Sequence, residues 1–323
     1  MADELAGEGI PVHVLGMRRS YDPLGSLRLL RLVQAGDFAL VHDHSTMAAA
    51  PVLALGLARV PLVVTEHLSL AQRRLDQRLS YRLLSPFVDC FIANSNATRD
   101  ELVRLGIAED KVRVIYHGLP ARAPAQRPTA RALVCGQRGW DAAPLVGFVG
   151  RLEPEKGCRA FVRVAAKVAA AVPAARFVMI GEGSERKALE AEILAAGLSD
   201  RVRMTGEMGE IEKAYPALDV LVSTSQRETF GLALLEAMAA GVAVAAFRVG
   251  GVGELIDAGA GVTVAPGDVS GLADAVLSLL REPDRRSALG RQACRRVTAR
   301  FAVERMAGEV AKVYDAVCAG RAH

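Results

Sequence analysis

Short apolar runs rich in β-branched residues alternate with longer segments of helical periodicity along most of the chain. This alternation is typical of βαβ units and predicts an α/β fold with parallel sheets. The expected strands of the first half lie at 11–16, 38–44, 60–67, 89–95 and 111–118. Those of the second half lie at 145–150, 175–181, 201–206, 218–225, 242–247 and 260–266.

One stretch interrupts this pattern and predicts a division into domains. Residues 120–143 are rich in proline, alanine and arginine and show no clear period, which is typical of a linker. A length of 323 residues also suits two domains. We therefore expect two doubly wound, Rossmann-like domains, at 1–119 and 144–300. A final helical segment at about 301–323 is expected to pack back on the first domain.

The beginning of the chain differs from an ordinary doubly wound domain. It opens on "MADELAGEGIPVHV", a pattern that indicates the end of a helix, a turn and a strand. Such domains usually begin with a strand whose following loop helps to form the site. We therefore expect that a first strand and its loop are missing, through N-terminal shortening or a misplaced start codon.

Composition excludes several classes of protein. A net charge of +4, from 40 basic and 36 acidic residues, requires neither nucleic acid nor a membrane as partner. The cysteines are odd in number and widely spaced, so neither a disulfide framework nor a zinc site is indicated, and a reducing, cytoplasmic compartment is expected. The apolar stretches 48–64 and 226–247 contain prolines or charged residues, which argues against membrane spans.

The stretch "STSQRETFGLALLEAMAAG" predicts an anion-binding helix start. If the strand ends near Ser225, the next helix begins near Gly231. The backbone N–H groups of Phe230, Gly231 and Leu232 then lie at a helix N-terminus, where unsatisfied donors and the helix dipole favour a phosphate.

This stretch also carries two glutamates. Glu228 lies in the loop before the helix, and Glu236 lies about one and a half turns inside it. Both carboxylates can accept hydrogen bonds from the paired hydroxyls of sugar rings, so they can contact two parts of one elongated ligand. The alternative is that Glu228 caps the helix and Glu236 faces solvent.

The segment "GFVGRLEPEKG" adds two cations. Arg151 and Lys156 follow a strand, at the edge where open α/β sheets bind ligands, and can hold a pyrophosphate as a leaving group. The alternative is a solvated basic loop. The glycine turns "IGEGSER", which contains Gly181, and "FRVGGVGELI" fit the same site, although each also suits an ordinary tight turn.

The segments "GRLEPEKG", "IGEGSER", "ALDVLVSTSQRETFGLALLEAMAAGVAVAA" and "GGVGELI", in this order and spacing, resemble the retaining glycosyltransferases of family four. The resemblance covers 145–320 and, less sharply, 10–118. It implies the GT-B fold, in which two Rossmann-like domains face each other across a donor-binding cleft. It also implies that the enzyme works without a metal or cofactor.

The resemblance assigns roles to individual residues. Arg151 and Lys156 match the pair that holds the diphosphate of a nucleotide-sugar, Glu228 the glutamate that binds the donor sugar, and Glu236 the one that binds the ribose. The base is received near Thr205 and Met208. The donor-binding set that the resemblance implies is Gly150, Arg151, Lys156, Gly181, Thr205, Met208, Glu228, Phe230, Gly231, Leu232 and Glu236.

Three histidines follow expected strands of the first domain. His42 and His44, two residues apart, suggest a metal pair, but no third ligand with suitable spacing accompanies them. His67, in "VVTEH", matches the family's histidine near the transferred sugar, so it joins Glu228, Arg151 and Lys156 as a catalytic candidate. The alternative is a histidine that is hydrogen-bonded within its domain.

A basic helix is expected at 72–86, with Arg73, Arg74, Arg78 and Arg82 beside leucines. A solvated basic face is the commoner explanation. The alternative is contact with an anionic membrane, on its inner face, that presents a lipid-linked acceptor.

The resemblance thus implies transfer of a sugar, with retention, from a UDP- or GDP-sugar to an acceptor hydroxyl in polysaccharide, glycolipid or glycoconjugate biosynthesis. The acceptor is not indicated. Two alternatives remain: a sugar-nucleotide epimerase of the same fold, and a non-catalytic nucleotide-sugar-binding subunit. The second is favoured by the lack of the family's glycine-rich first loop.

Overall fold

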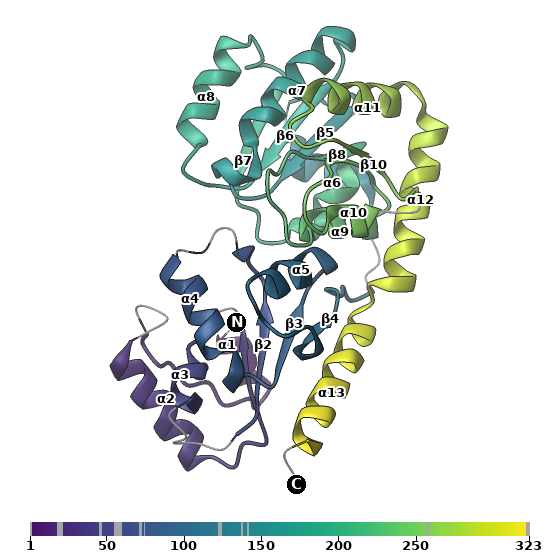
Figure 1. Ribbon diagram of the computed structural model, residues 1–323. Coiled ribbons are helices and arrows are strands. Elements are labelled where there is room, and N and C mark those ends of the chain that lie inside the picture. The colour runs from purple at the N-terminus through teal and green to yellow at the C-terminus, as the bar shows by residue number, and fades with distance from the viewer. Residues whose placement is uncertain are drawn as a thin grey trace. The chain divides into compact units, whose positions relative to one another are not determined.

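The computed structural model describes residues 2–17, 22–44, 47–54, 60–70, 73, 75–121, 125–136, 138–140, 142–256 and 259–320 (Figure 1). The chain forms two compact units. The first comprises Met1–Ala93, Arg99–Val114 and Val310–His323, and the second comprises Asn94–Thr98 and Ile115–Glu309.

The sheet of the first unit consists of four parallel strands in the order β1-β2-β3-β4. All five residues of β2 are buried, as expected for an interior strand that is covered on both faces. The strands are β1 (Val41–His44), β2 (Leu62–Glu66), β3 (Cys90–Ala93) and β4 (Val112–Val114).

Helix α5 (Asn96–Arg104), most of which belongs to the first unit, begins at a local sequence signal. The Ser95 hydroxyl accepts a hydrogen bond from the Thr98 N–H at 3.1 Å, which confirms the expected cap. The other helical segments of this unit are α1 (Ala2–Gly7), α2 (Pro23–Ala35), α3 (Ala49–Ala54), α4 (Leu75–Leu84), η2 (Ser85–Phe87), η3 (Glu109–Lys111) and the end of α13 (Val303–Ala319).

The expected strand at 11–16 is wrong. This segment has no regular secondary structure, and Val14 is 87% exposed. An isolated extended segment is not stable, because its backbone N–H and C=O groups need a neighbouring strand. The described strands of this sheet pair only with one another, and 11–16 is not among them.

The sheet of the second unit has six parallel strands in the order β10-β9-β8-β5-β6-β7. The chain runs outward from β5 through β6 to β7, and then crosses back to β8 on the other side of β5. This change of direction is a topological switch point between β5 and β8. The strands are β5 (Leu145–Val149), β6 (Arg176–Ile180), β7 (Val202–Gly206), β8 (Val220–Ser223), β9 (Ala243–Phe247) and β10 (Val262–Val264).

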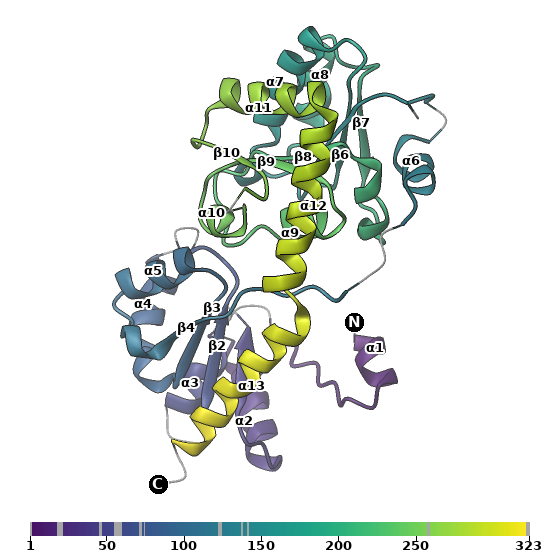
Figure 2. The same ribbon diagram turned by 90° about the vertical axis from the view of Figure 1, so that its right-hand side faces the viewer.

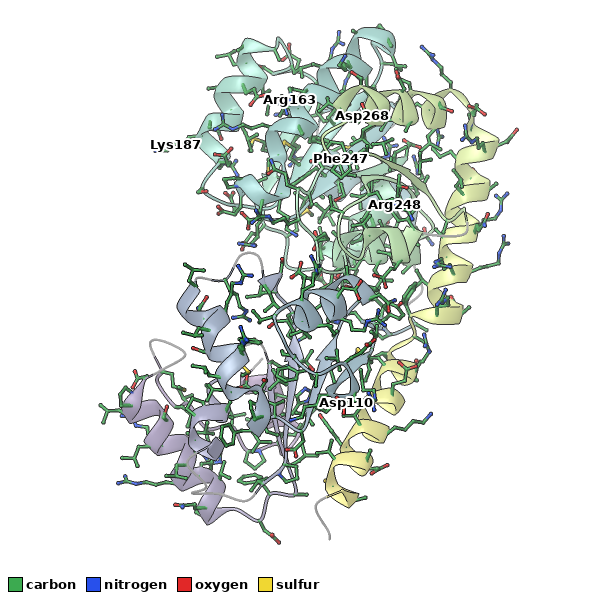
Figure 3. The ribbon with its side chains drawn as sticks, viewed as in Figure 1. Asp110, Arg163, Lys187, Phe247, Arg248 and Asp268 are labelled. Atoms are coloured by element: carbon green, nitrogen blue, oxygen red, sulfur yellow. The ribbon has the colours of Figure 1, made fainter. Side chains whose placement is uncertain are left out.

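Helices cover both faces of this sheet. The strands are added on one side of β5 and then on the other, and right-handed connections place the helices of the two halves on opposite faces. Helices α7 and α11 pack together on one face, and α9 and α10 lie on the other (Figures 1 and 2). Phe247 is buried at the end of β9, and Asp268 caps α11 by accepting from the Gly271 N–H at 2.8 Å; both are labelled in Figure 3. The helical segments of this unit are α6 (Arg127–Cys135), α7 (Cys158–Ala171), α8 (Arg186–Ala195), α9 (Leu232–Ala239), α10 (Val252–Ile256), α11 (Val269–Arg281), α12 (Pro283–Arg300), η4 (Pro154–Lys156), η5 (Ile211–Lys213) and η6 (Tyr215–Ala217).

Helix α6 lies within the stretch 120–143, which differs from the aperiodic linker expected there. Its residues Ala130 and Val134 are buried in the core of the second unit. Its arginines Arg127 and Arg131 both pair with Asp219 at 2.8 Å. These tertiary contacts, rather than local periodicity, hold α6 in place, because a nine-residue helix is marginal by itself.

Candidate active site

The candidate site lies at the switch point of the six-stranded sheet. β5 and β8 are adjacent and parallel, so their carboxyl ends meet at one edge of the sheet. The loop after β5 carries Lys156, and the loop after β8 carries Glu228. The expected start of the next helix is confirmed, because α9 begins at Leu232 with Gly231 as its N-cap.

The two loops are joined by close backbone contacts. Gly157 has φ +66°, and a Cβ at this position would lie 2.0 Å from the Thr224 carbonyl oxygen. Only glycine tolerates both this backbone conformation and this approach. The Gln226 N–H donates to the Glu155 carbonyl at 2.9 Å, and the Thr224 hydroxyl donates to the Lys156 carbonyl at 3.3 Å. The position of Lys156 is therefore fixed against the end of β8.

Lys156 and Glu228 form an ion pair. The Lys156 Nζ lies 2.7 Å from the Glu228 Oε2, and the two side chains are 23% and 15% exposed. The Ser225 hydroxyl, from a buried residue, donates to the same oxygen at 3.3 Å. Ser225 was not singled out as a site residue from the sequence, although its place at the end of a strand is a signal for it.

A glycine pair supports the Glu228 loop from the other side. The Gly251 N–H donates to the Glu228 carbonyl at 3.2 Å. Gly250 has φ +47°, and a Cβ there would lie 1.7 Å from the same carbonyl oxygen. The turn in "FRVGGVGELI" therefore holds the backbone of Glu228, a positioning role that the sequence alone did not distinguish from an ordinary turn.

The N-terminus of α9 provides the expected amide donors. The backbone N–H groups of its first turn have no acceptor within the helix. Phe230 is buried and its ring contacts Tyr116 and Phe301, while Leu232 is 47% exposed. The Phe230 side chain thus anchors the loop in the core, while Leu232, the first residue of the helix, is exposed.

Glu236 lies inside α9 and contacts a buried tyrosine. Its Oε2 accepts a hydrogen bond from the Tyr215 hydroxyl at 2.5 Å. Burial raises the pKa of Glu236 above its usual value, and the Tyr215 hydrogen bond partly opposes this shift. Burial also raises the pKa of Tyr215.

The remaining candidates of this unit lie at neighbouring strand ends. Arg151 pairs with Glu155 at 2.9 Å and remains 64% exposed, so it is not drawn into the Lys156 pair. Gly150 and Gly181 are in close contact, because a Cβ on Gly181 would lie 2.0 Å from the Gly150 carbonyl oxygen.

The residues expected near the base follow the same edge. Thr205, in β7, has its hydroxyl 3.0 Å from the Gly206 carbonyl. Met208 is partly buried and packs on the core of the second unit.

In the first unit, the three histidines form a chain of contacts. The His44 Nδ1 lies 2.9 Å from the His67 Nε2, and the rings are stacked at 5.2 Å. His42 contacts the hydroxyls of Thr65 at 2.7 Å and Tyr314 at 2.6 Å.

The surroundings of His42 and of His67 lower their pKa values and favour the neutral imidazole. Burial, and next the neighbouring His44, lower the pKa of His42 to about 4. The same two causes lower the pKa of His67. Within the described part of the chain, no group of three or more His, Cys, Asp or Glu side chains is arranged to hold a metal ion.

The basic segment 72–86 differs in part from the expected basic face. Arg73 points inward and pairs with the buried Glu66 at 2.9 Å. Arg74 lies outside the described residues. Arg78 and Arg82 are exposed on α4, together with three leucines at intervals of four residues: Leu75 at 81%, Leu79 at 56% and Leu83 at 63%. Among the described helices, none is both long and apolar enough to cross a membrane.

The two parallel-sheet units, together with comparisons with known proteins, define a class of protein, the glycosyltransferases with two parallel-sheet domains. The model of the family Glycosyl transferases group 1 matches residues 137–296, and that of Glycosyltransferase Family 4 matches 2–122. A lipopolysaccharide core biosynthesis mannosyltransferase, LpcC of Rhizobium leguminosarum bv. viciae, is 33% identical over 83% of this chain and 75% of its own length.

Two further comparisons agree with this family. The 2-deoxystreptamine glucosyltransferase of Streptomyces kanamyceticus is 41% identical over 44% of this chain, although the match spans only 38% of that protein. The structure of Anabaena Alr3699/HepE in complex with UDP-glucose superposes with a TM-score of 0.81 at 25% identity, and covers 97% of this chain and 88% of that one. The chain belongs to the group 1 glycosyltransferase family and has the GT-B fold.

Proposed function

We propose that this protein transfers a sugar from a nucleotide diphosphate donor, a UDP- or GDP-sugar, to an acceptor hydroxyl with retention at the anomeric carbon. The observation that carries the proposal is the 2.7 Å contact of Lys156 with Glu228. In a nucleotide-sugar, the sugar hydroxyls lie next to the diphosphate. A cation for the diphosphate and a carboxylate for the hydroxyls are therefore needed side by side. The UDP-glucose complex of HepE supports this type of donor.

The chemistry follows from the charges of these groups. As the bond between the anomeric carbon and the diphosphate breaks, negative charge develops on the departing oxygen. Lys156, Arg151 and the amides of Phe230, Gly231 and Leu232 stabilise this charge. Glu228 orients the sugar through its hydroxyls, and Glu236 binds the ribose through its carboxylate. Thr205 and Met208 lie on the side of the base, and neither a metal nor a cofactor takes part.

His67 is the contribution of the first unit to this proposal. With its pKa lowered, the imidazole is neutral near pH 7 and can accept or donate a hydrogen bond to a sugar hydroxyl. Its contact with His44 restricts which ring nitrogen carries the proton. We assign it to positioning the transferred sugar.

The part of the proposal that concerns the acceptor rests on the exposed surface of α4. The exposed leucines with Arg78 and Arg82 beside them suit the surface of an anionic membrane better than open solvent, because the leucines gain from leaving water. We place the reaction on the cytoplasmic face of a membrane, with a lipid-linked or glycoconjugate acceptor. Biosynthesis of polysaccharide or glycolipid fits this placement, as does the lipopolysaccharide-core relative.

The test compares Lys156→Ala and Glu228→Gln with the unchanged full chain, by donor consumption and product formation with UDP- and GDP-sugars. Each substitution is expected to lower the rate by about a hundredfold or more, because each removes a group that stabilises the transition state. Lys213→Ala is the matched control, because Lys213 is an exposed lysine of the same unit that pairs with the exposed Glu210. Unchanged transfer in either site variant contradicts the proposal.

Two alternative functions give different results in the same assay. A sugar-nucleotide epimerase converts the donor without any acceptor. A non-catalytic subunit binds the donor in calorimetry and consumes none of it.

A further inference from the structure

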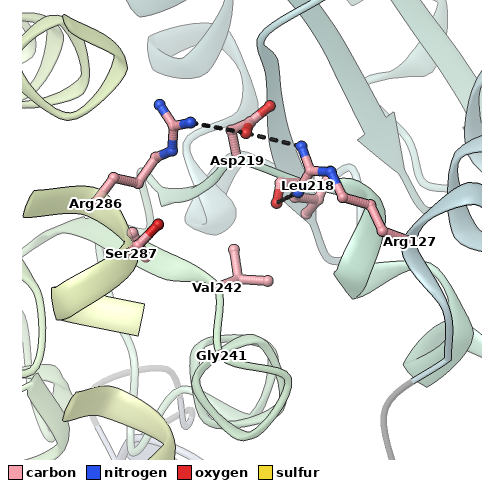
Figure 4. Close-up of a pocket in the computed structure, with 8 residues that line it drawn as sticks. Arg127, Leu218, Asp219, Gly241, Val242, Arg286 and Ser287 are labelled. Atoms are coloured by element: carbon pink, nitrogen blue, oxygen red, sulfur yellow. Dashed lines mark hydrogen bonds and ion pairs between the residues drawn. The ribbon is translucent and has the colours of Figure 1, made fainter. Parts of the chain in front are cut away.

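A polar pocket lies in the six-stranded unit, at the edge of the sheet opposite the candidate active site. Its volume is about 380 Å³, within the range of small-ligand pockets. Leu218 and Asp219 directly precede β8, and Gly241 and Val242 directly precede β9, so the pocket lies at the amino ends of these strands. Figure 4 shows Arg127 and Arg286 on either side of Asp219, with Ser287 beside Arg286.

The side chains that line this pocket, together with the buried Arg131 next to it, carry more positive than negative charge. Asp219 is 8% exposed and is paired with three arginines: Arg127 at 2.8 Å, Arg131 at 2.8 Å and Arg286 at 3.3 Å. It also accepts from the Leu145 N–H at 2.8 Å. One carboxylate thus faces three guanidinium groups, which leaves an excess of positive charge at the pocket.

The pair of Asp219 with Arg131 is the most buried of the three. Arg131 is 5% exposed and neutralises the carboxylate within the core. Arg127 and Arg286 remain 49% and 21% exposed and line the pocket. Each guanidinium has five N–H donors. Arg127 also donates to the carbonyls of Pro216 and Leu218, and Arg286 to those of Leu279 and Leu280. Both Arg127 and Arg286 therefore keep N–H groups that can donate hydrogen bonds to a ligand.

The other groups at the pocket modify this charge without cancelling it. Ser287, in the second turn of α12, adds an exposed hydroxyl. The acidic residues at the start of α12, Glu282 and Asp284, do not line the pocket, and Glu282 pairs with Arg285 at 3.2 Å.

From these observations we propose that the pocket binds a small molecule through a phosphate or pyrophosphate group, held between Arg127 and Arg286 with Ser287 as a further donor. Arginine forks match the oxygens of such groups, and charge-assisted hydrogen bonds to them are strong. The site is separate from the proposed donor site, because the four residues of β8 place about 13 Å of strand between the two edges.

The probe is inorganic pyrophosphate, titrated by calorimetry into the full chain at constant ionic strength. Ser287→Glu places a carboxylate at the pocket, so it is expected to weaken binding by about tenfold or more through like-charge repulsion. Ala299→Glu is the matched control, an exposed position of α12 with the same change of charge, about 18 Å further along the helix. Arg127→Gln, at a half-exposed side chain, is expected to weaken binding as Ser287→Glu does. Thermal melts check that each variant is folded.

Pyrophosphate can also occupy the donor site, and Lys156→Ala distinguishes the two. Binding that persists in Lys156→Ala and Ala299→Glu but is weakened in Ser287→Glu and Arg127→Gln supports the second site. Binding that is lost in Lys156→Ala and unchanged in Ser287→Glu overturns it, as does the absence of any binding to the unchanged chain. Donor transfer is assayed separately, so failure of the proposed function leaves this result interpretable.

Discussion

The Glu236 carboxylate lies 2.5 Å from the Tyr215 hydroxyl, so the residue that we assign to the ribose is also tied to the core of its unit. Burial raises its pKa in the folded state. The protonated form is therefore favoured by folding. The stabilisation that this form provides is complete below the unfolded pKa and is lost as pH rises through the folded pKa.

This loss of stability with rising pH gives the first prediction. Glu236→Gln keeps an acceptor for Tyr215 and removes the titration. We expect the free energy of unfolding of the variant to exceed that of the unchanged chain by a margin that grows as pH rises from about 4 to 7. Denaturant unfolding at several pH values measures this difference, and a margin independent of pH contradicts it. Donor binding is expected to weaken in the same variant.

The second prediction concerns the glycine pair behind Glu228. Gly250→Ala places a methyl group where the Glu228 carbonyl oxygen lies, so it is expected to shift the loop and lower the transfer rate about tenfold or more. Gly267→Ala is the matched control, because Gly267 also has a positive φ, +81°, but open space around its Cβ position. A similar loss of activity in both variants indicates backbone strain alone and contradicts the positioning role.

The third prediction concerns the buried carboxylate Asp219. Asp219→Asn removes the charge that compensates the buried Arg131, and we expect a loss of about 3 kcal/mol in the free energy of unfolding. Asp100→Asn, at an exposed pair with Arg99, is expected to cost less than about 1 kcal/mol. Equal effects at the two positions, measured by urea unfolding, contradict this distinction.

The fourth prediction concerns α4 and the membrane. Leu79→Glu places a charge in the middle of the exposed leucine row and is expected to reduce cosedimentation with vesicles that contain anionic lipid. Leu194→Glu, at a leucine that is 70% exposed on α8, is the control that should bind as the unchanged chain does. No binding of the unchanged chain to these vesicles contradicts the proposed contact.

Local sequence determined the α/β class, the strands from residue 38 onward and the helix start near Gly231. Hydrophobic periodicity, helix caps and glycine turns are signals that extend over only a few residues, so they can be identified without the fold. It also placed Lys156 and Glu228 at the ends of strands. The segment 11–16 and helix α6 were decided by tertiary structure, because an extended segment needs a partner and a short helix needs a core.

The contact between Lys156 and Glu228 required the fold. These residues are 72 positions apart, and they meet only because β8 returns beside β5 at the switch point. At the opposite edge of the sheet, Asp219, which precedes β8, meets Arg127 from α6 and Arg286 from α12. The sequence by itself determined which residues are available at each strand end. The order of the strands, which arises from long-range pairing, decided which of them act together.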